Sequence, residues 1–230
     1  MVNIKSGETF ERVFLNEPEV NLHIVQEARS HVKIHVLNIP AEESRDREIE
    51  ISNNIVVEQT GEGCETEIYG LAYLRGSEKV TTETHVHHAV GGGRSNQLLK
   101  FVLDDSAHGR FIGDLKIAPD AQKTEAHQTN RNLVLSEGAE MRTQPQLEIY
   151  ADDVQATHGA STGQLDETAL FYMQQRGISV EEAKLLLEFA FINEVIDKME
   201  LEPLRDRLHH LVEMRFRGQL NKCEGCKLCK

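Results

Sequence analysis

The sequence predicts a mainly β protein, a β-solenoid followed by a C-terminal α-helical subdomain, and three observations lead to this fold class. Apolar and polar residues alternate with a period of two from about residue 8 to residue 160, as in strands with one buried face. Small or apolar residues recur near the turns at positions 92, 107, 121, 138 and 154, which are 14 to 17 residues apart, as expected when each coil returns the chain to the next rung. From Leu165 onward the apolar spacing becomes helical.

A β-sandwich also spaces its strands regularly, at about 8 to 12 residues, so the spacing alone leaves this alternative open. The sequence contains neither Asn-Gly nor Asp-Gly, the strongest short signals of a tight hairpin, which favours the solenoid. Nine segments have the alternation of a strand, and polar turns separate them. They are residues 20–26, 30–39, 47–59, 66–74, 79–90, 96–103, 109–118, 131–136 and 144–151.

Cap signals define three helices in the C-terminal part. Asp166 precedes the first helix as its N-cap, and Gly177 follows it at the C′ position. Ser179 and Glu182 form a capping box at the start of the second helix, and apolar residues lie on most of its faces. Pro203 stands at or near the first position of the third. The predicted helices are residues 167–176, 180–200 and 203–216.

These patterns divide the chain into three parts: a β-helix core domain (1–164), a C-terminal helical subdomain (165–218) and a flexible Cys-rich tail (219–230). The second helix has more apolar surface than one neighbour can cover. This surplus indicates a protein partner.

Charge and composition narrow the classes of partner. The formal net charge of −13 disfavours nucleic acid and anionic membrane surfaces, because both are bound mainly through clustered Lys and Arg. No apolar run approaches the ~20 residues of a membrane span, and the N-terminal residues lack the order of a signal peptide. Of the four cysteines, one stands alone and three crowd the last eight positions, which favours reduced thiols and a cytoplasmic location.

The run LEIYADDVQATHGASTGQLDETALFYMQQRGISVEEAKLLLEFAF, residues 147–191, resembles the C-terminal core of the SufB/SufD family, the scaffold proteins of SUF iron–sulfur cluster assembly. The Asp-Asp-Val, His-Gly-Ala, Gly-x-Leu-Asp-Glu and Leu-Phe-Tyr-x-x-x-Arg-Gly-Ile elements have the family's order and spacing. The resemblance extends from about residue 50 to residue 218.

The resemblance implies a right-handed parallel β-helix with a C-terminal helical subdomain. It also implies a non-catalytic scaffold whose β-helix pairs with a SufB partner and whose helices dock the ATPase SufC. An iron–sulfur cluster would be held transiently and shared with SufB, with none bound stably. Isolated chains are expected to be able to form homodimers. Members of the family usually carry a further N-terminal region, so this chain is expected to be either a piece of a longer protein or a short variant.

Two departures from the SufB pattern point to the SufD branch. SufB proteins carry a reactive cysteine in the strand that corresponds to HQTNRNLVLS, where this chain has Asn130, Arg131 and Asn132. SufB proteins also read more like Glu-His-Glu-Ala where this chain reads Thr-His-Gly-Ala. By the resemblance, His158 lies at the SufB–SufD interface and takes part in cluster assembly.

His158 is accordingly the first candidate site residue. A neutral imidazole is a borderline ligand suited to ferrous iron. The alternative is a polar residue that satisfies turn amides at the end of the β-helix.

Asp152 and Asp153 offer hard oxygen ligands, although such pairs more often cap turn amides. The tail has the spacing C-x-x-C-x-x-C at Cys223, Cys226 and Cys229, whose thiolates suit iron, zinc or a cluster. No fourth ligand adjoins these cysteines, so transient metal or sulfur handling and an incidental tail both remain open.

His85 and His87 share one face of a predicted strand and His88 takes the other. Stacked rows of a solenoid could bring His108 or His127 near the pair and complete a metal site, although solvated surface histidines are the simpler interpretation.

The rings of Phe171, Phe189 and Phe191 are the candidate contacts of the ATPase-docking helices. Two rival functions remain: a carbohydrate-active β-helix enzyme that uses Asp pairs as acid and base, and a stand-alone metal-binding solenoid. The enzyme is disfavoured by an aromatic content of 5% and the absence of tryptophan.

Overall fold

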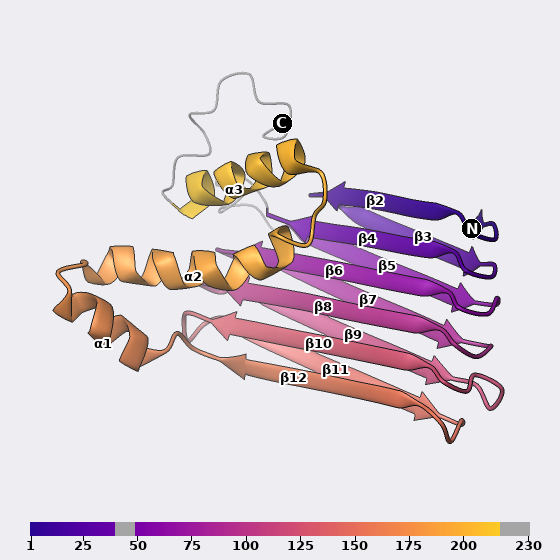
Figure 1. Ribbon diagram of the computed structural model, residues 1–230. Coiled ribbons are helices and arrows are strands. Elements are labelled where there is room, and N and C mark those ends of the chain that lie inside the picture. Colours follow the sequence, from indigo (N-terminus) through magenta and orange to yellow (C-terminus); the bar gives the residue numbers. More distant parts are fainter. Residues whose placement is uncertain (40–48, 217–230) are drawn as a thin grey trace.

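The computed structural model describes residues 1–39 and 49–216. Within these residues twelve strands form two six-stranded sheets, and three helices follow (Figure 1). The strands are β1 (Val2–Ile4), β2 (Thr9–Leu15), β3 (Glu19–Gln26), β4 (His31–Asn38), β5 (Glu50–Gln59), β6 (Glu65–Leu74), β7 (Lys79–His88), β8 (Arg94–Leu103), β9 (His108–Ile117), β10 (Glu125–Val134), β11 (Glu140–Ile149) and β12 (Gln155–Gly163).

Consecutive strands alternate between the two sheets, which makes the β part a solenoid. Sheet A has the order β1-β3-β5-β7-β9-β11 and sheet B the order β2-β4-β6-β8-β10-β12. Every pair of neighbours is parallel, so the hairpin-built sandwich is excluded. Arg94 pairs with Glu125 and Lys79 with His108. The predicted spacing of 14 to 17 residues is therefore half a coil.

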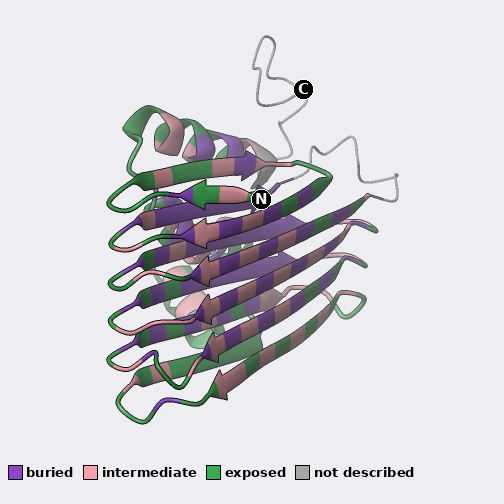
Figure 2. Ribbon diagram, turned by 90° about the vertical axis from the view of Figure 1, so that its right-hand side faces the viewer, coloured by how far each residue is buried: buried purple, intermediate pink, exposed green. Residues whose placement is uncertain are grey.

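The core lies between the sheets, because every second side chain of each central strand points inward. The pattern is strict in β7, where buried and half-buried residues alternate over all ten positions; Figure 2 shows it as purple stripes along the coils. The inward residues include Ile24, Val57 and Leu115, and near the other edge Phe101 and Phe111.

The strand predictions fail at both ends of the solenoid. The sequence pattern predicts no separate strand for β1, β2 or β12, and the predicted segment 131–136 covers only the last part of β10. These segments lack clean alternation because one side of their coil is open or because their inward residues are polar. The inward residues of β10, for example, include Gln128, Asn130 and Asn132, all buried.

Helices α1 and α2 begin where their cap residues predict, and α3 begins one residue before its predicted start. Asp166 accepts hydrogen bonds from the backbone at the start of α1 (Glu167–Gln175), and Gly177 follows that helix with φ of 86°. Ser179 Oγ accepts from the Glu182 amide at the start of α2 (Val180–Ile196). The predicted extension of α2 to residue 200 is wrong, since the helix ends at Ile196. α3 spans Glu202–Phe216.

Helices α2 and α3 pack on the outer face of sheet B, and α1 lies beyond the ends of its strands (Figure 1). This packing explains why the outward residues of β6 and β8 are buried although they lie outside the solenoid. The apolar cluster between helices and sheet contains Leu37, Ile39, Tyr69, Leu71, Tyr73, Leu98, Val102, Ile192, Val195, Ile196, Met199, Leu208, Leu211 and Val212.

Two lysines on sheet B hold the helices by charge as well. The Lys100 ammonium donates to the carbonyl of Phe191 at 2.7 Å, pairs with the Glu194 carboxylate and lies 4.2 Å from the centre of the Phe191 ring. Burial lowers the pKa of Lys100, and the pair with Glu194 opposes that shift. Closer to α3, Lys33 donates to Glu200 at 2.7 Å.

A buried carboxyl in α2 makes this packing sensitive to pH. Glu188 is 5% exposed, and burial raises its pKa to about 7. Arg75 and Asp104, which directly follow β6 and β8, interact with it, and Lys184 lies on its own helix. Arg75 and Lys184 lower the pKa and Asp104 raises it. Because the folded pKa exceeds the unfolded value of about 4.5, stabilisation is fully present below pH 4.5 and is lost as the pH rises through 7.

Glu188→Gln is therefore expected to leave stability at low pH nearly unchanged and to raise it above pH 7, by roughly 3 kcal/mol at most. Urea unfolding of both proteins at a series of pH values measures the difference. Parallel curves for the two proteins across this range would contradict the prediction. Glu181→Gln, a change near the start of the same helix at an exposed residue, is the matched control.

Candidate functional site at the open end of the solenoid

The last coil of the solenoid ends with two unpaired strand edges. β11 is the last strand of sheet A and β12 the last strand of sheet B. In the described part of the chain neither has a strand on its outer side. The bottom of Figure 2 shows this coil as mostly exposed, in contrast to the buried stripes of the coils above it. Free N–H and C=O groups along such edges are able to pair with strands of another chain.

His158 lies in the middle of this terminal strand, and its register places its side chain on the inner face. His158 pairs with Gln128 of β10, and Gln128 pairs with Gln97 of β8. Paired residues of parallel strands project to the same side, and both glutamines are buried between the sheets. His158 is exposed only because no further coil covers it. The imidazole therefore sits at the mouth of the solenoid interior.

The interior beneath this mouth is polar. Asn130 and Asn132 exchange hydrogen bonds of 3.0 and 2.7 Å, and Asn132 also donates to Thr162 Oγ1 at 3.1 Å. These contacts tie β12 to β10 from inside, in addition to the ladder between them. The sequence pattern did not identify this polar interior. Its signal is the presence of amides at the period-two positions of β10, where apolar residues are expected.

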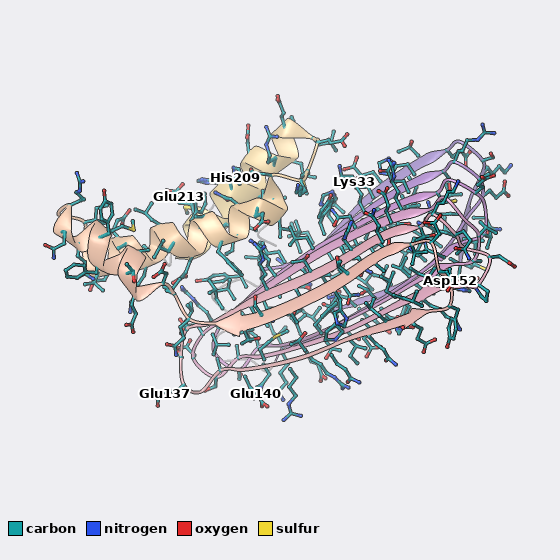
Figure 3. The ribbon with its side chains drawn as sticks, turned by 60° about the horizontal axis from the view of Figure 1, so that its bottom comes forward. Lys33, Glu137, Glu140, Asp152, His209 and Glu213 are labelled. Atoms are coloured by element: carbon teal, nitrogen blue, oxygen red, sulfur yellow. The ribbon has the colours of Figure 1, made fainter. Side chains whose placement is uncertain are left out.

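Asp152 and Asp153 lie at the turn that joins β11 to β12. Figure 3 shows Asp152 at one edge of the last coil and Glu137 and Glu140 at the other. The backbone N–H of Asp153 donates to Gln122 Oε1 at 2.9 Å, and its carbonyl accepts from the amide of Lys123. These are structural turn contacts. Both carboxylates are exposed.

His85 and His87 project together from the outer face of β7, as expected, and His88 points inward. The register does not bring a third histidine to them. His108 pairs with Lys79 at the far end of the strand, and His127 belongs to sheet B. His85 faces Asp114 instead, with Nδ1 3.6 Å from its carboxylate. Across residues 1–39 and 49–216, no three His, Cys, Asp or Glu side chains form a group that could hold a metal ion.

The three candidate docking phenylalanines lie in different surroundings. Phe171 in α1 is 62% exposed, next to Tyr172 at 59%. Phe189 and Phe191 are half-buried and pack in the cluster between α2 and sheet B. The ring of Phe189 also contacts His209 of α3 edge-on, at 6.0 Å between ring centres. Figure 3 shows His209 within the helical part.

The cysteines fall into two groups. Cys64 is free and buried, and its thiol donates to the carbonyls of Glu27 and Gly61 at 3.1 Å. The motif formed by Cys223, Cys226 and Cys229 lies outside the described residues.

The structure is a parallel solenoid with an imidazole at its open end and a helical cap. Comparison with known families identifies the class of protein that has this arrangement. Residues 20–191 match the family model described as SUF system FeS cluster assembly, SufBD core domain. The chain belongs to this family, and the resemblance read from the sequence is confirmed.

Among its relatives, an iron–sulfur cluster assembly SufBD family protein of Synechocystis is 35% identical over 192 residues, which cover 84% of this chain and 41% of the relative. The iron–sulfur cluster assembly protein SufD of Escherichia coli is 34% identical over 168 residues, covering 73% of this chain and 40% of that protein. A chloroplastic protein of Arabidopsis thaliana is 33% identical over 162 residues, which cover 70% of this chain and 34% of that protein.

The chain thus spans about two fifths of the length of the first two of these relatives. None of the described helices combines the length and the apolar character that crossing a membrane requires.

Proposed function

We propose that this SufBD-family protein acts as a SufD-like scaffold subunit, which pairs with a SufB-type partner through the open end of its solenoid and docks a SufC-type ATPase through its helices. The observation that carries the proposal is the position of His158, in the middle of a terminal strand with one free edge. A partner strand added to that edge would bring its own inward side chains over the imidazole.

The chemistry of the site supports a shared cluster. Neutral imidazole suits iron, but the described residues within the mouth offer only amides, hydroxyls and apolar groups beside it. Iron–sulfur clusters are held mainly by thiolates. A partner that supplies a thiolate would therefore complete a site that this chain only half provides. The protein would be non-catalytic, and the cluster would be its transient cargo.

The family membership weighs against both rivals. A carbohydrate-active enzyme needs two carboxylates facing one bond across about 5 to 9.5 Å, whereas Asp152 and Asp153 are consecutive exposed turn residues. A stand-alone metal-binding solenoid needs a complete ligand set, and the described residues contain none. The cytoplasmic location expected from the sequence stays a prediction, as do the metal roles of His85, His87 and the cysteine tail.

Co-expression of the chain with SufB-type and SufC-type proteins of the same host tests the proposal. The expected result is a stable ternary complex that forms an iron–sulfur cluster under anaerobic reconstitution, with no stoichiometric metal in the isolated chain. Tight metal in the isolated chain and no complex would favour the stand-alone metal-binding protein. A homodimer of the isolated chain that dissociates when the SufB-type partner is added would support pairing through the same edge.

Phe171→Asp tests the docking face. Phe171 and Tyr172 are exposed neighbours on α1, so a charge there is expected to weaken binding of the SufC-type ATPase by at least tenfold, since buried aromatic anchors dominate interfaces. Thermal stability should not change, because the ring makes few contacts within the chain. Pull-down and calorimetric titration measure the effect. Glu167→Gln in the same helix serves as the control, and unaltered affinity of Phe171→Asp would remove α1 from the docking face.

A further inference from the structure

One column of inward side chains runs through sheet B to His158 and changes character along its length. The paired positions are Ile34, Ile68, Gln97, Gln128 and His158, one from each of five successive strands. The first two are apolar, as in an ordinary solenoid core. The last three are polar, and the column ends at the open mouth.

The two glutamines of the column are buried without a protein partner. Gln97 is 0% and Gln128 1% exposed. In both, neither the amide nitrogen nor the amide oxygen has a hydrogen-bond partner among the residues that the structure describes. Buried amide groups are almost always paired, with protein or with ordered water. Two adjacent exceptions in one column, directly below a candidate site residue, therefore require an explanation.

The facing sheet makes room for the amide of Gln128. Gly113 of β9 lies opposite, and a Cβ atom on it would stand 2.4 Å from Gln128 Nε2 and 2.6 Å from Cζ of Phe111. Glycine is thus needed at this position for the amide to extend across the interior. The Phe111 ring lies against the same glycine, and His158 occupies the next position along the column. In the next coil the partner of Gly113 is Pro145.

Neighbouring rungs of a sheet lie about 4.8 Å apart, so one water between two side chains of adjacent rungs is able to bond to both. Gln128 is the rung next to His158, and Gln97 is the rung below Gln128. The amide nitrogen of Gln128 lies nearest to Gly113, so the carbonyl oxygen of the amide is the group that remains as an acceptor.

We infer that Gln128 is a positioning residue for His158: its amide bonds the inward imidazole nitrogen through one bound water, and the other nitrogen is presented to the mouth of the solenoid. This inference rests on the proposed role of His158. A fixed tautomer matters because only a nitrogen without a proton binds iron, and the bond made by the other nitrogen decides which one that is. Gln97 lies one rung below Gln128 and does not reach the imidazole.

The test compares Gln128→Met with Gln97→Met in the full chain. Each change replaces a buried, unpartnered amide of the same column by an apolar side chain of similar length. Histidine labelled with nitrogen-15 reports the tautomer of His158 at alkaline pH, where imidazole is neutral, and His158→Ala assigns its signals. In Gln128→Met the ratio of the two tautomers is expected to move about fivefold toward that of free histidine, as for the loss of one hydrogen bond. Gln97→Met is expected to shift it far less.

Gly113→Ala provides a second variant, because it displaces the amide without removing it and should move the ratio in the same direction. An unchanged tautomer ratio in Gln128→Met would overturn the inference. If Gln128→Met does not fold, an unchanged ratio in Gly113→Ala would overturn it instead. Equal shifts in Gln128→Met and Gln97→Met would also overturn it, since they would indicate a general effect on packing. The measurement needs neither partner nor cluster. If Gln128→Met shifts the tautomer ratio but still gives a normal cluster yield, the result would contradict the proposed function of His158 and leave the positioning contact intact.

Discussion

His158→Ala is expected to abolish most cluster formation by the reconstituted complex while leaving the chain folded. The side chain is exposed at the end of the solenoid and stabilises nothing above it, so the free energy of unfolding should stay within about 0.5 kcal/mol of the parent. Loss of a group that only orients a metal ligand costs about 10- to 100-fold, and loss of the ligand itself is expected to cost at least as much.

The matched control is His127→Ala. His127 lies on the neighbouring strand β10 but on the outer face of sheet B, where Nδ1 contacts Thr157 Oγ1 at 2.8 Å. It should retain full cluster yield. Anaerobic reconstitution followed by absorbance and iron determination measures both variants. Normal yield from His158→Ala, with a correctly assembled complex, would withdraw the site assignment.

Phe101→Ala is expected to give the largest loss of stability, about 3 to 5 kcal/mol. Phe101 lies on the central strand β8, points into the core between the sheets and is 2% exposed. Its removal would leave a cavity bounded by rigid strands, which relax little. Domains are stable by only about 5 to 15 kcal/mol, so the urea midpoint followed by circular dichroism should fall substantially.

Phe171→Ala is the matched control for this prediction, since it makes the same substitution at an exposed ring. Its unfolding midpoint should equal that of the parent within about 0.5 kcal/mol. If Phe101→Ala were as stable as Phe171→Ala, the core between the two sheets could not be packed as described.

The main elements of the fold could be predicted because their causes are local. The half-coil spacing reflects turns that each coil must repeat, and α1 and α2 begin at Asp166 and Ser179 because those side chains accept backbone amides. The end of α2 was less predictable. The helical pattern continues past Ile196, and the chain turns there to bring Met199 and α3 onto the same apolar cluster.

The candidate site was only partly predictable from the sequence. His158 came from the family resemblance, but its inward direction follows from the register of β12 with β10, which no local pattern specifies. β12 itself has Ala156, His158, Ala160 and Thr162 at its inward positions, a set too small and polar to indicate a strand. Gln97 and Gln128 were missed for a related reason: a buried amide and an exposed one look alike in a sequence.

The three candidate docking phenylalanines differ in how far they are exposed, and there is a physical reason why the sequence does not predict this difference. An apolar helix needs cover, but its sequence does not say whether the cover is its own sheet or another protein. For Phe189 and Phe191 much of that cover is the chain itself, through the cluster on sheet B. Phe171 stays exposed because α1 extends past the ends of the strands (Figure 1).

The short link between β12 and α1 has a mechanical consequence. β12 ends at Gly163 and α1 begins at Glu167, so three residues, with a reach of about 10 Å, join the strand that carries His158 to the helix that carries Phe171. Any pull on that helix is transmitted as tension to the outermost strand, which is anchored on one flank only. An ATPase that docked on α1, as proposed, would therefore act directly on the strand that carries the candidate cluster ligand His158.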